Sequence, residues 1–474
     1  MGPDTLRTLT FEQMAIGMLF VGIACGAAMM HAQPDTFWHL RAGEDIWRTL
    51  SVPLRDTYSY TAAGREWPNH EWLWQAVTYV VHGVGGFPLL SIFASATITA
   101  AFVAVYRLMV GPPLHRFWLL LASLPLSASV WALRPQVVSL ALLALLLTLI
   151  ARERYRWLPP LFVLWANFHG AVALGGLVLG AVTLAALVQA RARQPVARRR
   201  ALVLLAVTPL SALGTAATPL GFRLWRYIFD SAGRSFQVGI NEWLPSYPTA
   251  PLEIAFWIVV LVFLSLLVLR WRRLVSWSDV ALVVAALALL PPAIRAGRNI
   301  APFMLIVVPA ASRLLGADFQ LLSRARPAPS PPRRLNSILL GGMTAAGLAM
   351  VVTAWSLPLA RLNWQPVTPG ALAALRACKG PLYNYYDDGG YLIWFLREKP
   401  VFIDSRQDPY PHAFVLQAGV VETTGAFDDV FARHKITCAF LPAISPVRPR
   451  LQQAGWWAAF SDEKWAVLQA PGVL

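Results

Sequence analysis

Residues 14–41 read MAIGMLFVGIACGAAMMHAQPDTFWHLR, an uncharged apolar run that ends in a polar and aromatic stretch. Ten more apolar runs follow along the chain. The chain is 57% hydrophobic and only 14% charged, whereas soluble domains are about 25% charged. Its mean hydropathy is +0.53. No soluble core needs this much apolar sequence, so the sequence predicts a polytopic α-helical membrane protein.

The apolar runs predict eleven spans. They cover residues 12–30, 86–107, 117–133, 135–151, 157–168, 171–190, 201–218, 252–270, 278–294, 299–316 and 336–356. A full crossing needs about 20 residues, so the arm at 157–168 is short. We expect its tip to lie in a water-filled depression, because polar backbone is tolerated at membrane depth only there.

The net charge of +16 comes from 36 Arg and four Lys, and all four Lys lie beyond residue 370. The Arg residues cluster between spans, at 116, 152–156, 191–200, 270–273 and 324–334. Such clusters are typical of cytoplasmic loops. They predict a cytoplasmic N-terminus and an extracytoplasmic tail. The charge therefore needs no nucleic-acid partner.

The predicted domains are a transmembrane domain at 1–356, with a first outer loop at 31–85, and a soluble extracytoplasmic domain at 357–474. In the tail, strand-like pieces at 381–386, 400–404, 437–441 and 465–469 alternate with helix-like pieces at 369–378, 389–397, 425–434 and 447–454. This alternation predicts a small α/β sheet. In an extracytoplasmic domain, Cys378 and Cys438 either pair or remain buried thiols.

Asp35 is the first candidate for chemistry, because it directly follows the first span. A carboxylate at a membrane surface faces a reduced dielectric, which raises its basicity. It would then act as a general base on an acceptor hydroxyl or ligate a divalent ion. The alternative is that Asp35 simply caps a helix that starts near Thr36.

The stretch PDTFWHLR at 34–41 resembles the D-P-x-F-x-x-R segment of oligosaccharyltransferase catalytic subunits, which belong to the GT-C glycosyltransferases. The plan of spans, first loop and tail is also similar to that of protein O-mannosyltransferases and aminoarabinose transferases. The WHL, HEW and GGYLIW stretches resemble those of a group of bacterial multi-pass proteins, a kinship that names no reaction. The GT-C resemblance implies a catalytic Asp35, a substrate-binding Arg41 and a polyprenyl-phosphate sugar donor.

One feature departs from the GT-C pattern. Those families usually carry paired acidic residues, and here Thr36 stands beside Asp35. A second catalytic carboxylate would therefore come from Asp56 or Glu71. A divalent metal ion, Mg or Mn, is a possible cofactor, and no metal ligands are assigned.

Several other polar residues lie in apolar or interfacial surroundings and are candidates for substrate binding. His39 stands four residues after Asp35 and would orient it, unless it is an ordinary surface histidine. His70, next to Glu71, forms an acid/base or metal pair, or else marks the start of an interfacial helix. Asn167 and His169 lie at the tip of the short arm, where polar groups are functional by default, or form a helix-breaking turn.

Three arginines, Arg134, Arg295 and Arg298, fall on the predicted outer side. Positive charge is disfavoured there, and a guanidinium binds phosphate oxygens in pairs. We therefore expect them to bind the phosphate of the donor, with interfacial snorkelling as the alternative.

The sequence predicts a membrane glycosyltransferase that passes a sugar from a polyprenyl-phosphate donor to an acceptor at the extracytoplasmic face. The alternatives are a transporter or flippase for a lipid-linked glycan and a non-catalytic assembly protein. In the tail, the polar stretches 385–391 and 401–410 follow predicted strands, where α/β folds place ligands. They bind a sugar acceptor or only form turns.

Overall fold

The structure is a computed structural model that describes residues 9–192, 194–234, 243–316, 333–357 and 362–472. By its internal contacts the chain divides into two units. We call the first the helical unit; it contains α1, α3 from Ser91 onward, and the later apolar helices. The second, the loop–tail unit, joins His31–Leu90 to Pro358–Leu474. Each unit is described by itself.

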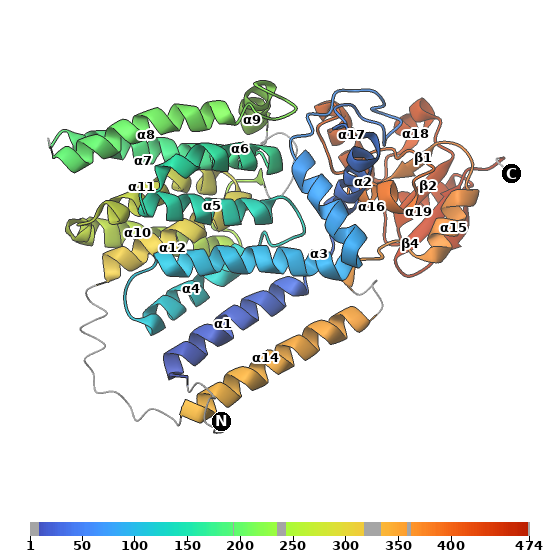
Figure 1. The fold of residues 1–474 in the computed structure, drawn as a ribbon. Helices are drawn as coiled ribbons and strands as arrows, with labels where there is room; N and C mark the ends of the chain where they lie inside the picture. Colours follow the sequence, from blue (N-terminus) through green and yellow to red (C-terminus); the bar gives the residue numbers. More distant parts are fainter. Residues whose placement is uncertain (1–8, 193, 235–242, 317–332, 358–361, 473–474) are drawn as a thin grey trace. The chain divides into compact units, whose positions relative to one another are not determined.

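Every predicted span coincides with a helix (Figure 1). The helices are α1 (Phe11–Ala28), α3 (Trp72–Leu108), α4 (Pro113–Ala128), α5 (Gln136–Ala151), α6 (Leu158–Phe168), α7 (Val172–Ala190), α8 (Pro195–Gly214), α10 (Pro251–Arg270), α11 (Trp277–Arg295), α12 (Ile300–Leu315) and α14 (Arg333–Ser356), with the amphipathic α9 (Arg223–Arg234) between α8 and α10. Among the described residues, seven helices are long and apolar enough to cross a membrane. The chain is a multi-pass membrane protein.

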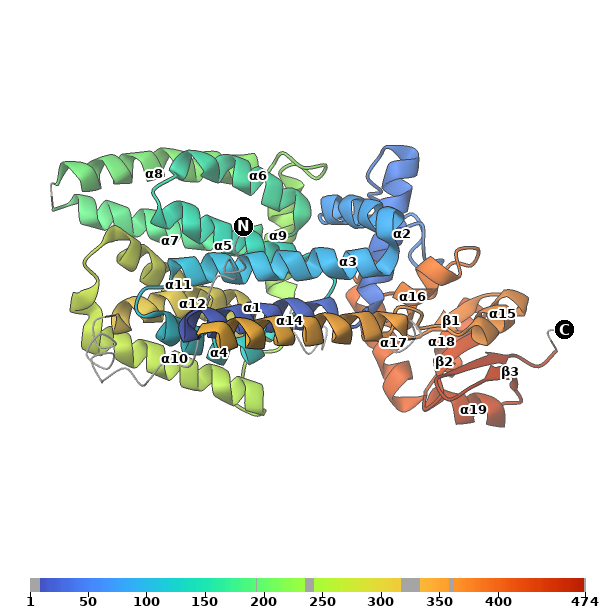
Figure 2. The same cartoon turned by 60° about the horizontal axis from the view of Figure 1, so that its bottom comes forward.

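Two further features define the helical unit. Buried residues occur along the whole of α12, which packs against α4, α5, α10 and α11. Helix α14 lies beside α1 in both ribbon views (Figures 1 and 2).

Helix α6 has only 11 residues and so extends about 16 Å, about half of the hydrocarbon core of a bilayer. The short arm that the sequence predicts is confirmed.

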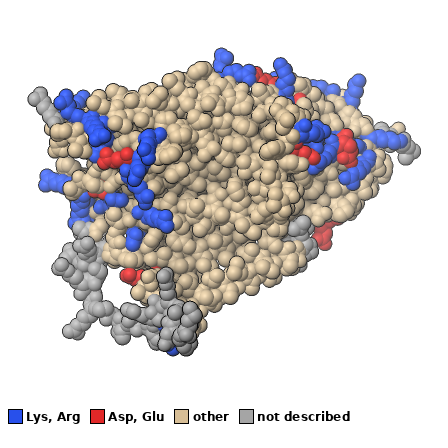
Figure 3. Space-filling view, viewed as in Figure 1, with Lys and Arg blue, Asp and Glu red and all other residues tan. Residues whose placement is uncertain are grey.

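The connections α5–α6, α7–α8 and α10–α11 meet at one end of the helical unit. Arg200, near the start of α8, forms an ion pair of 2.9 Å with Glu153, which follows α5. The Arg200 guanidinium also lies 4.6 Å from the ring centroid of Trp277, the first residue of α11. Basic side chains gather at this end of the bundle, beside a broad uncharged face (Figure 3). The cluster at 324–334 lies mostly outside the described residues.

The loop–tail unit contains α2 (Pro34–Thr49), the first part of α3 up to a kink at Gly85–Gly86, and the α/β tail. The tail elements are α15 (Pro369–Ala377), β1 (Leu382–Asn384), α16 (Asp388–Phe395), α17 (His412–Thr424), α18 (Asp428–His434), β2 (Cys438–Pro442), α19 (Val447–Gln453), β3 (Trp457–Ser461) and β4 (Trp465–Gln469). The sheet order is β1-β2-β4-β3, parallel between β1 and β2 and antiparallel elsewhere. The predicted α/β tail is confirmed, although α17 and β3 were not predicted.

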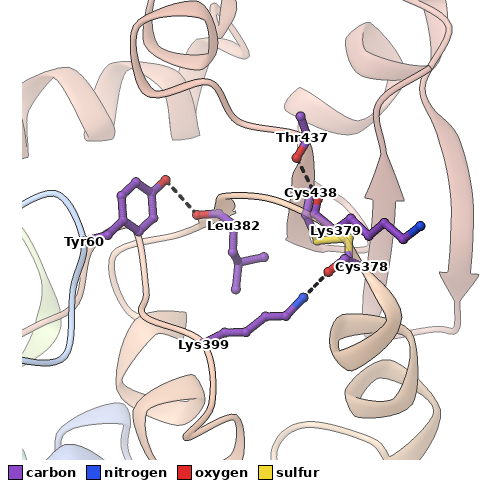
Figure 4. Close-up of a disulfide and its surroundings, with 7 residues drawn as sticks. All are labelled: Tyr60, Cys378, Lys379, Leu382, Lys399, Thr437 and Cys438. Carbon is purple, nitrogen blue, oxygen red and sulfur yellow. Dashed lines mark hydrogen bonds between the residues drawn. A yellow bond between two sulfur atoms is a disulfide. The ribbon is translucent and has the colours of Figure 1, made fainter. Parts of the chain in front are cut away.

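The predicted strand at 400–404 is not in this sheet, because it pairs with the first loop instead. Ser59 and Val401 form a parallel bridge. The Tyr60 amide donates to Val401 O at 3.1 Å, and the Val401 amide donates to Tyr58 O at 2.9 Å. The Tyr60 hydroxyl also donates to Leu382 O at 3.0 Å (Figure 4). The first outer loop thus takes part in the fold of the tail.

A disulfide joins Cys378 at the end of α15 to Cys438 at the start of β2 (Figure 4). The Cα atoms are 6.0 Å apart, within the usual range for a disulfide. Of the two possibilities left by the sequence, the structure has the paired form. The bond closes a loop with a sequence separation of 60 residues across the middle of the tail.

Removing this bond with Cys378→Ser and Cys438→Ser is expected to destabilise the tail by about 4 kcal/mol, the chain-entropy contribution of a loop of this length. Thermal unfolding of the purified protein measures the effect. Cys25→Ser is the matched control, because Cys25 is the free cysteine in α1. An unchanged melting temperature in the double variant would contradict a stabilising role for the bond.

Candidate active site

Asp35 lies in the first turn of α2, which begins at Pro34. The proline fixes a helical φ where a missing N–H costs nothing, and a carboxylate in the first turn interacts well with the helix dipole. The N-cap residue is Gln33, so the alternative that Asp35 caps a helix starting near Thr36 is wrong. The carboxylate is half-buried.

Two side chains donate hydrogen bonds to Asp35 Oδ1. Trp38 Nε1, one turn further along α2, lies 3.1 Å away, and the Ser405 hydroxyl of the tail forms a short hydrogen bond with the same oxygen. Trp38 Nε1 is also 3.2 Å from Ser405 Oγ. Trp38 is buried, so these contacts fix the carboxylate in place.

Two glycines of α16 allow the tail to approach Asp35 closely. A Cβ on Gly390 would lie 2.5 Å from Pro34 O, and one on Gly389 would lie 2.0 Å from Ile403 O. Both distances are impossible for a real side chain, so glycine is required at each position. The DDGG stretch at 387–390 therefore packs α16 against the start of α2 and the segment that carries Ser405.

Acidic groups surround the Tyr386 hydroxyl, which donates to Ser405 O at 3.2 Å. Burial, and then the charges of Asp35 and Asp404, raise the pKa of Tyr386 well above its ordinary value. The phenol therefore stays protonated. Burial also raises the pKa of Asp388 well above its ordinary value. The Tyr386 phenol and the Asp388 carboxyl therefore hold their protons more tightly than they would in water.

Burial raises the pKa of Glu422 to about 7, although the Tyr386 amide donates to its carboxylate at 2.6 Å. The folded state therefore binds this proton more tightly than the unfolded state, where the pKa is about 4.5. The stabilisation is complete below that value and is lost as the pH rises to about 7. We expect the melting temperature of the native protein to fall over this window.

Glu422→Gln is expected to lessen that fall, which melting curves at pH 5 and pH 8 would measure. Glu398→Gln is the control, because Glu398 is exposed and its backbone hydrogen bond lowers its pKa. If the Glu422→Gln variant and the native chain lose equal stability between the two pH values, Glu422 does not titrate as described.

Asp56, a predicted catalytic carboxylate, lies in a buried network. Arg406 Nη2 donates to Asp56 Oδ1 at 2.5 Å and to Asp404 Oδ2 at 2.7 Å, and all three side chains are fully buried. Ser59 Oγ also donates to Asp56 Oδ2 at 2.5 Å. Burial alone would lower the pKa of Arg406, but Asp404 raises it well above its ordinary value, so the guanidinium stays charged. These contacts favour a structural role for Asp56.

Glu71, the other predicted second carboxylate, lies between two histidines. His39 Nε2 is 3.6 Å from Glu71 Oε2, and His70 Nε2 is 3.6 Å from Glu71 Oε1. His70 Nδ1 lies 3.1 Å from Pro68 O. His39 is buried, and its ring lies against that of Trp38, tilted by 35° with 3.6 Å between centroids. His39 is thus not a surface residue, and it links the Glu71 cluster to the Trp38 that holds Asp35.

Arg41 lies one and a half turns beyond Asp35 on α2. Its guanidinium forms ion pairs with Glu44 at 3.2 Å and Asp45 at 3.6 Å. These are i,i+3 and i,i+4 partners on one face of the helix. Its substrate-binding role remains a prediction.

In the helical unit, Asn167 and His169 lie at the end of α6, as the sequence predicts. Asn167 Nδ2 donates to Val163 O at 2.8 Å and Ala217 O at 2.9 Å. His169 Nδ1 is 2.8 Å from Ser139 Oγ, which also accepts from Trp165 Nε1. Both residues are buried. These contacts fasten the short arm to its neighbours.

The three arginines predicted to bind phosphate also belong to the helical unit. Arg134 precedes α5, Arg295 ends α11 and is exposed, and Arg298 lies just before α12. The Arg298 guanidinium lies 4.2 Å from the ring centroid of Trp243. Their role in binding the donor phosphate stays a prediction.

No group of three or more His, Cys, Asp or Glu side chains that could hold a metal ion occurs among the residues that the structure describes. The sequence assigned no metal ligands. The possible Mg or Mn cofactor therefore gains no ligand set from these side chains.

The residues that sequence reasoning missed are Trp38 and Ser405 as partners of Asp35, Tyr386 as a partner of Ser405, and Arg406 as the partner of Asp56. The signal was present in part, because the polar stretch 401–410 follows a strand-like run. No local pattern, however, pairs it with a helix more than 360 residues earlier in the chain.

Two solved structures that are similar to this chain identify its fold. The archaeal oligosaccharyltransferase AglB from Archaeoglobus fulgidus, in complex with an inhibitory peptide and a dolichol-phosphate, superposes with a TM-score of 0.53 at 11% identity over 90% of this chain and 69% of its own. ArnT from Cupriavidus metallidurans in the apo state gives 0.50 at 15% identity over 95% of this chain and 97% of its own. No family model and no curated protein matches the sequence. The chain has the GT-C fold of integral-membrane glycosyltransferases, and the predicted resemblance is confirmed.

Proposed function

We propose that the protein is a glycosyltransferase that moves a sugar from a polyprenyl-phosphate donor to an acceptor hydroxyl, with Asp35 as the general base. The observation that carries the proposal is a half-buried carboxylate, fixed by Trp38 and Ser405 at the start of α2, in a chain with the GT-C fold. A relative of the same fold, AglB, has been solved with dolichol-phosphate. That finding supports a lipid-linked donor.

In the proposed reaction, the acceptor oxygen attacks the anomeric carbon of the donor sugar. The bond between that carbon and the phosphate oxygen breaks, and polyprenyl phosphate leaves with the bonding electrons. Asp35 accepts the proton of the acceptor hydroxyl. A carboxylate held in one geometry loses less freedom on reaching the transition state than a mobile one. Trp38 and Ser405 are the proposed positioning residues.

Two further roles belong to the proposal. Arg134, Arg295 and Arg298 bind the donor phosphate, because guanidinium forks pair with phosphate oxygens. The other predicted residues support the site from three places. Glu71, His39 and His70 form the second carboxylate cluster, and Asp56 belongs to the buried ion network. Asn167 and His169 lie at the end of the short arm.

The test is an assay for release of free polyprenyl phosphate by the purified protein. Candidate donors are undecaprenyl-phosphate sugars, with and without EDTA and added Mg or Mn. The proposal expects donor turnover that depends on an acceptor. No release from any such donor, by a protein that melts cooperatively, would refute it.

We also propose that the loop–tail unit lies on the extracytoplasmic side of a bacterial inner membrane, with the Arg-rich end of the helical unit in the cytoplasm. The Cys378–Cys438 disulfide supports this orientation, because disulfides persist in oxidising compartments. The basic end of the helical unit that contains Arg200 also supports this orientation, because cytoplasmic loops carry an excess of Lys and Arg.

Single cysteines introduced at Arg198, Arg272 and Asp428 test the orientation by labelling intact cells with an impermeant maleimide, in a Cys25→Ser background. The cysteine at Asp428, an exposed position of α18, is expected to react, and the other two are expected to react only after lysis. Labelling of the Arg198 and Arg272 positions alone in intact cells would reverse the topology.

A further inference from the structure

A cleft of about 540 Å³ lies in the loop–tail unit, between the second half of α2 and the chain that follows α16. Four cations line it, Arg41, Arg48, Arg397 and Lys399. The cleft is separate from the contacts of Asp35. Since α2 rises about 1.5 Å per residue, Arg41 lies about 9 Å and Arg48 about 20 Å along the helix axis from Asp35.

The charges of the cleft do not cancel. Asp45 is its one lining acid, and it pairs with Arg41 and Arg48. Glu44, beside the cleft, pairs with Arg41 at 3.2 Å and with Arg397 at 2.8 Å. Four positive and two negative groups leave a net charge of +2, so the cleft has an unmatched attraction for an anion.

Lys399 accounts for part of this excess. Its ammonium donates to Cys378 O (Figure 4), and no carboxylate lies within ion-pair distance of it among the ion pairs of the described residues. Burial lowers its pKa, which means that the charged form lacks part of its solvation. An anionic ligand would stabilise the charged ammonium in place of the solvation that burial removes.

The rest of the lining is not simply basic. Ile393, Leu396 and Tyr58 are buried and form an apolar floor. Thr49, Ser51 and Thr57 contribute hydroxyls. Apolar side chains suit the C–H face of a pyranose ring, hydroxyls suit sugar hydroxyls, and guanidinium groups suit phosphate or carboxylate oxygens.

We propose that this cleft binds a carbohydrate that bears an anionic group, either phosphate or carboxylate. Arg48 and Lys399 bind the anion, and the floor and the hydroxyls bind the ring. The identification of this ligand as the acceptor rests on the proposed function, whereas the binding itself does not depend on it.

Calorimetry on the full-length protein in a neutral detergent tests the proposal with glucose 6-phosphate and glucuronate as probes. Glucose and inorganic phosphate are the matched controls for the anion and for the ring. We expect at least one anionic sugar to bind at least tenfold more tightly than either control. The double variant Arg48→Gln, Lys399→Gln should weaken it by at least tenfold.

Arg376→Gln is the control variant, because Arg376 is an exposed tail arginine that pairs with Glu398 outside the cleft. It should change the affinity by less than twofold. If the double variant does not fold, Arg48→Gln alone serves, since that side chain is 69% exposed, and a threefold or greater loss is expected.

Equal affinity for glucose, tight binding of inorganic phosphate alone, or full binding by the cleft variants would overturn the proposal. Competition by nanodiscs containing phosphatidylglycerol would identify a lipid headgroup as the occupant and would also overturn it. Failure of the proposed function looks different, because anionic sugars would still bind while no donor released polyprenyl phosphate.

Discussion

Asp35→Asn is expected to lower the rate of sugar transfer by a factor of about 10² to 10⁴, the usual cost of losing a general base. The amide keeps the shape of the carboxylate and can still accept hydrogen bonds from Trp38 and Ser405. It cannot accept the proton of the acceptor. Release of polyprenyl phosphate per minute measures the effect, and the melting temperature should stay close to that of the native protein.

Asp428→Asn provides the control, because this carboxylate is exposed on α18. It should retain full activity. If the Asp35→Asn protein transfers sugar at the native rate, Asp35 is structural, and the base must be sought at Glu71 or Asp56. A Ser405→Ala variant adds a second readout. Loss of a positioning hydrogen bond should lower kcat more than it raises KM.

Arg406→Met is expected to destabilise the loop–tail unit by roughly 3 to 5 kcal/mol. The change leaves Asp56 and Asp404 buried without the cation that pairs with both. It also removes the guanidinium that lies over the rings of Tyr58 and Trp67, 4.8 Å from each ring centroid. Thermal or denaturant unfolding of the purified protein is the measurement.

Two variants make this result specific. Arg376→Met breaks an exposed pair with Glu398 and should cost no more than about 1 kcal/mol. Adding Asp56→Asn and Asp404→Asn to Arg406→Met should restore part of the stability, because the uncompensated charges are then gone. An Arg406→Met protein as stable as the Arg376→Met protein would contradict a buried ion network.

The membrane helices could be predicted from sequence because their signal is local. A run such as 14–30 must be buried in lipid or protein wherever it lies, and Arg clusters mark the ends of several later runs. The tail was harder. Strand 457–461 is mostly exposed although its sequence is WAAFS, so it lacks the alternation of apolar and polar residues that indicates a strand. The segment at Val401 pairs with the first loop rather than with the sheet.

Asp35 could be singled out from its place after the first span, but its surroundings could not. Its partner Ser405 is 370 residues away in sequence, and a pairing at that distance leaves no trace in composition or periodicity. The same holds for Asp56 and Arg406, 350 residues apart. From the sequence, the DDGG stretch at 387–390 either formed a turn or belonged to a sugar-binding stretch. Its glycines are needed because the backbone of Pro34 and Ile403 approaches them so closely.

The most direct test of the central claim is a structure of the full-length protein in nanodiscs with bound undecaprenyl phosphate. The phosphate should contact at least one of Arg134, Arg295 and Arg298 and should lie within two Debye lengths, ~16 Å, of Asp35. A phosphate bound at another face, farther than that from Asp35, would contradict the assignment of Asp35 as the base of a polyprenyl-phosphate-dependent transferase.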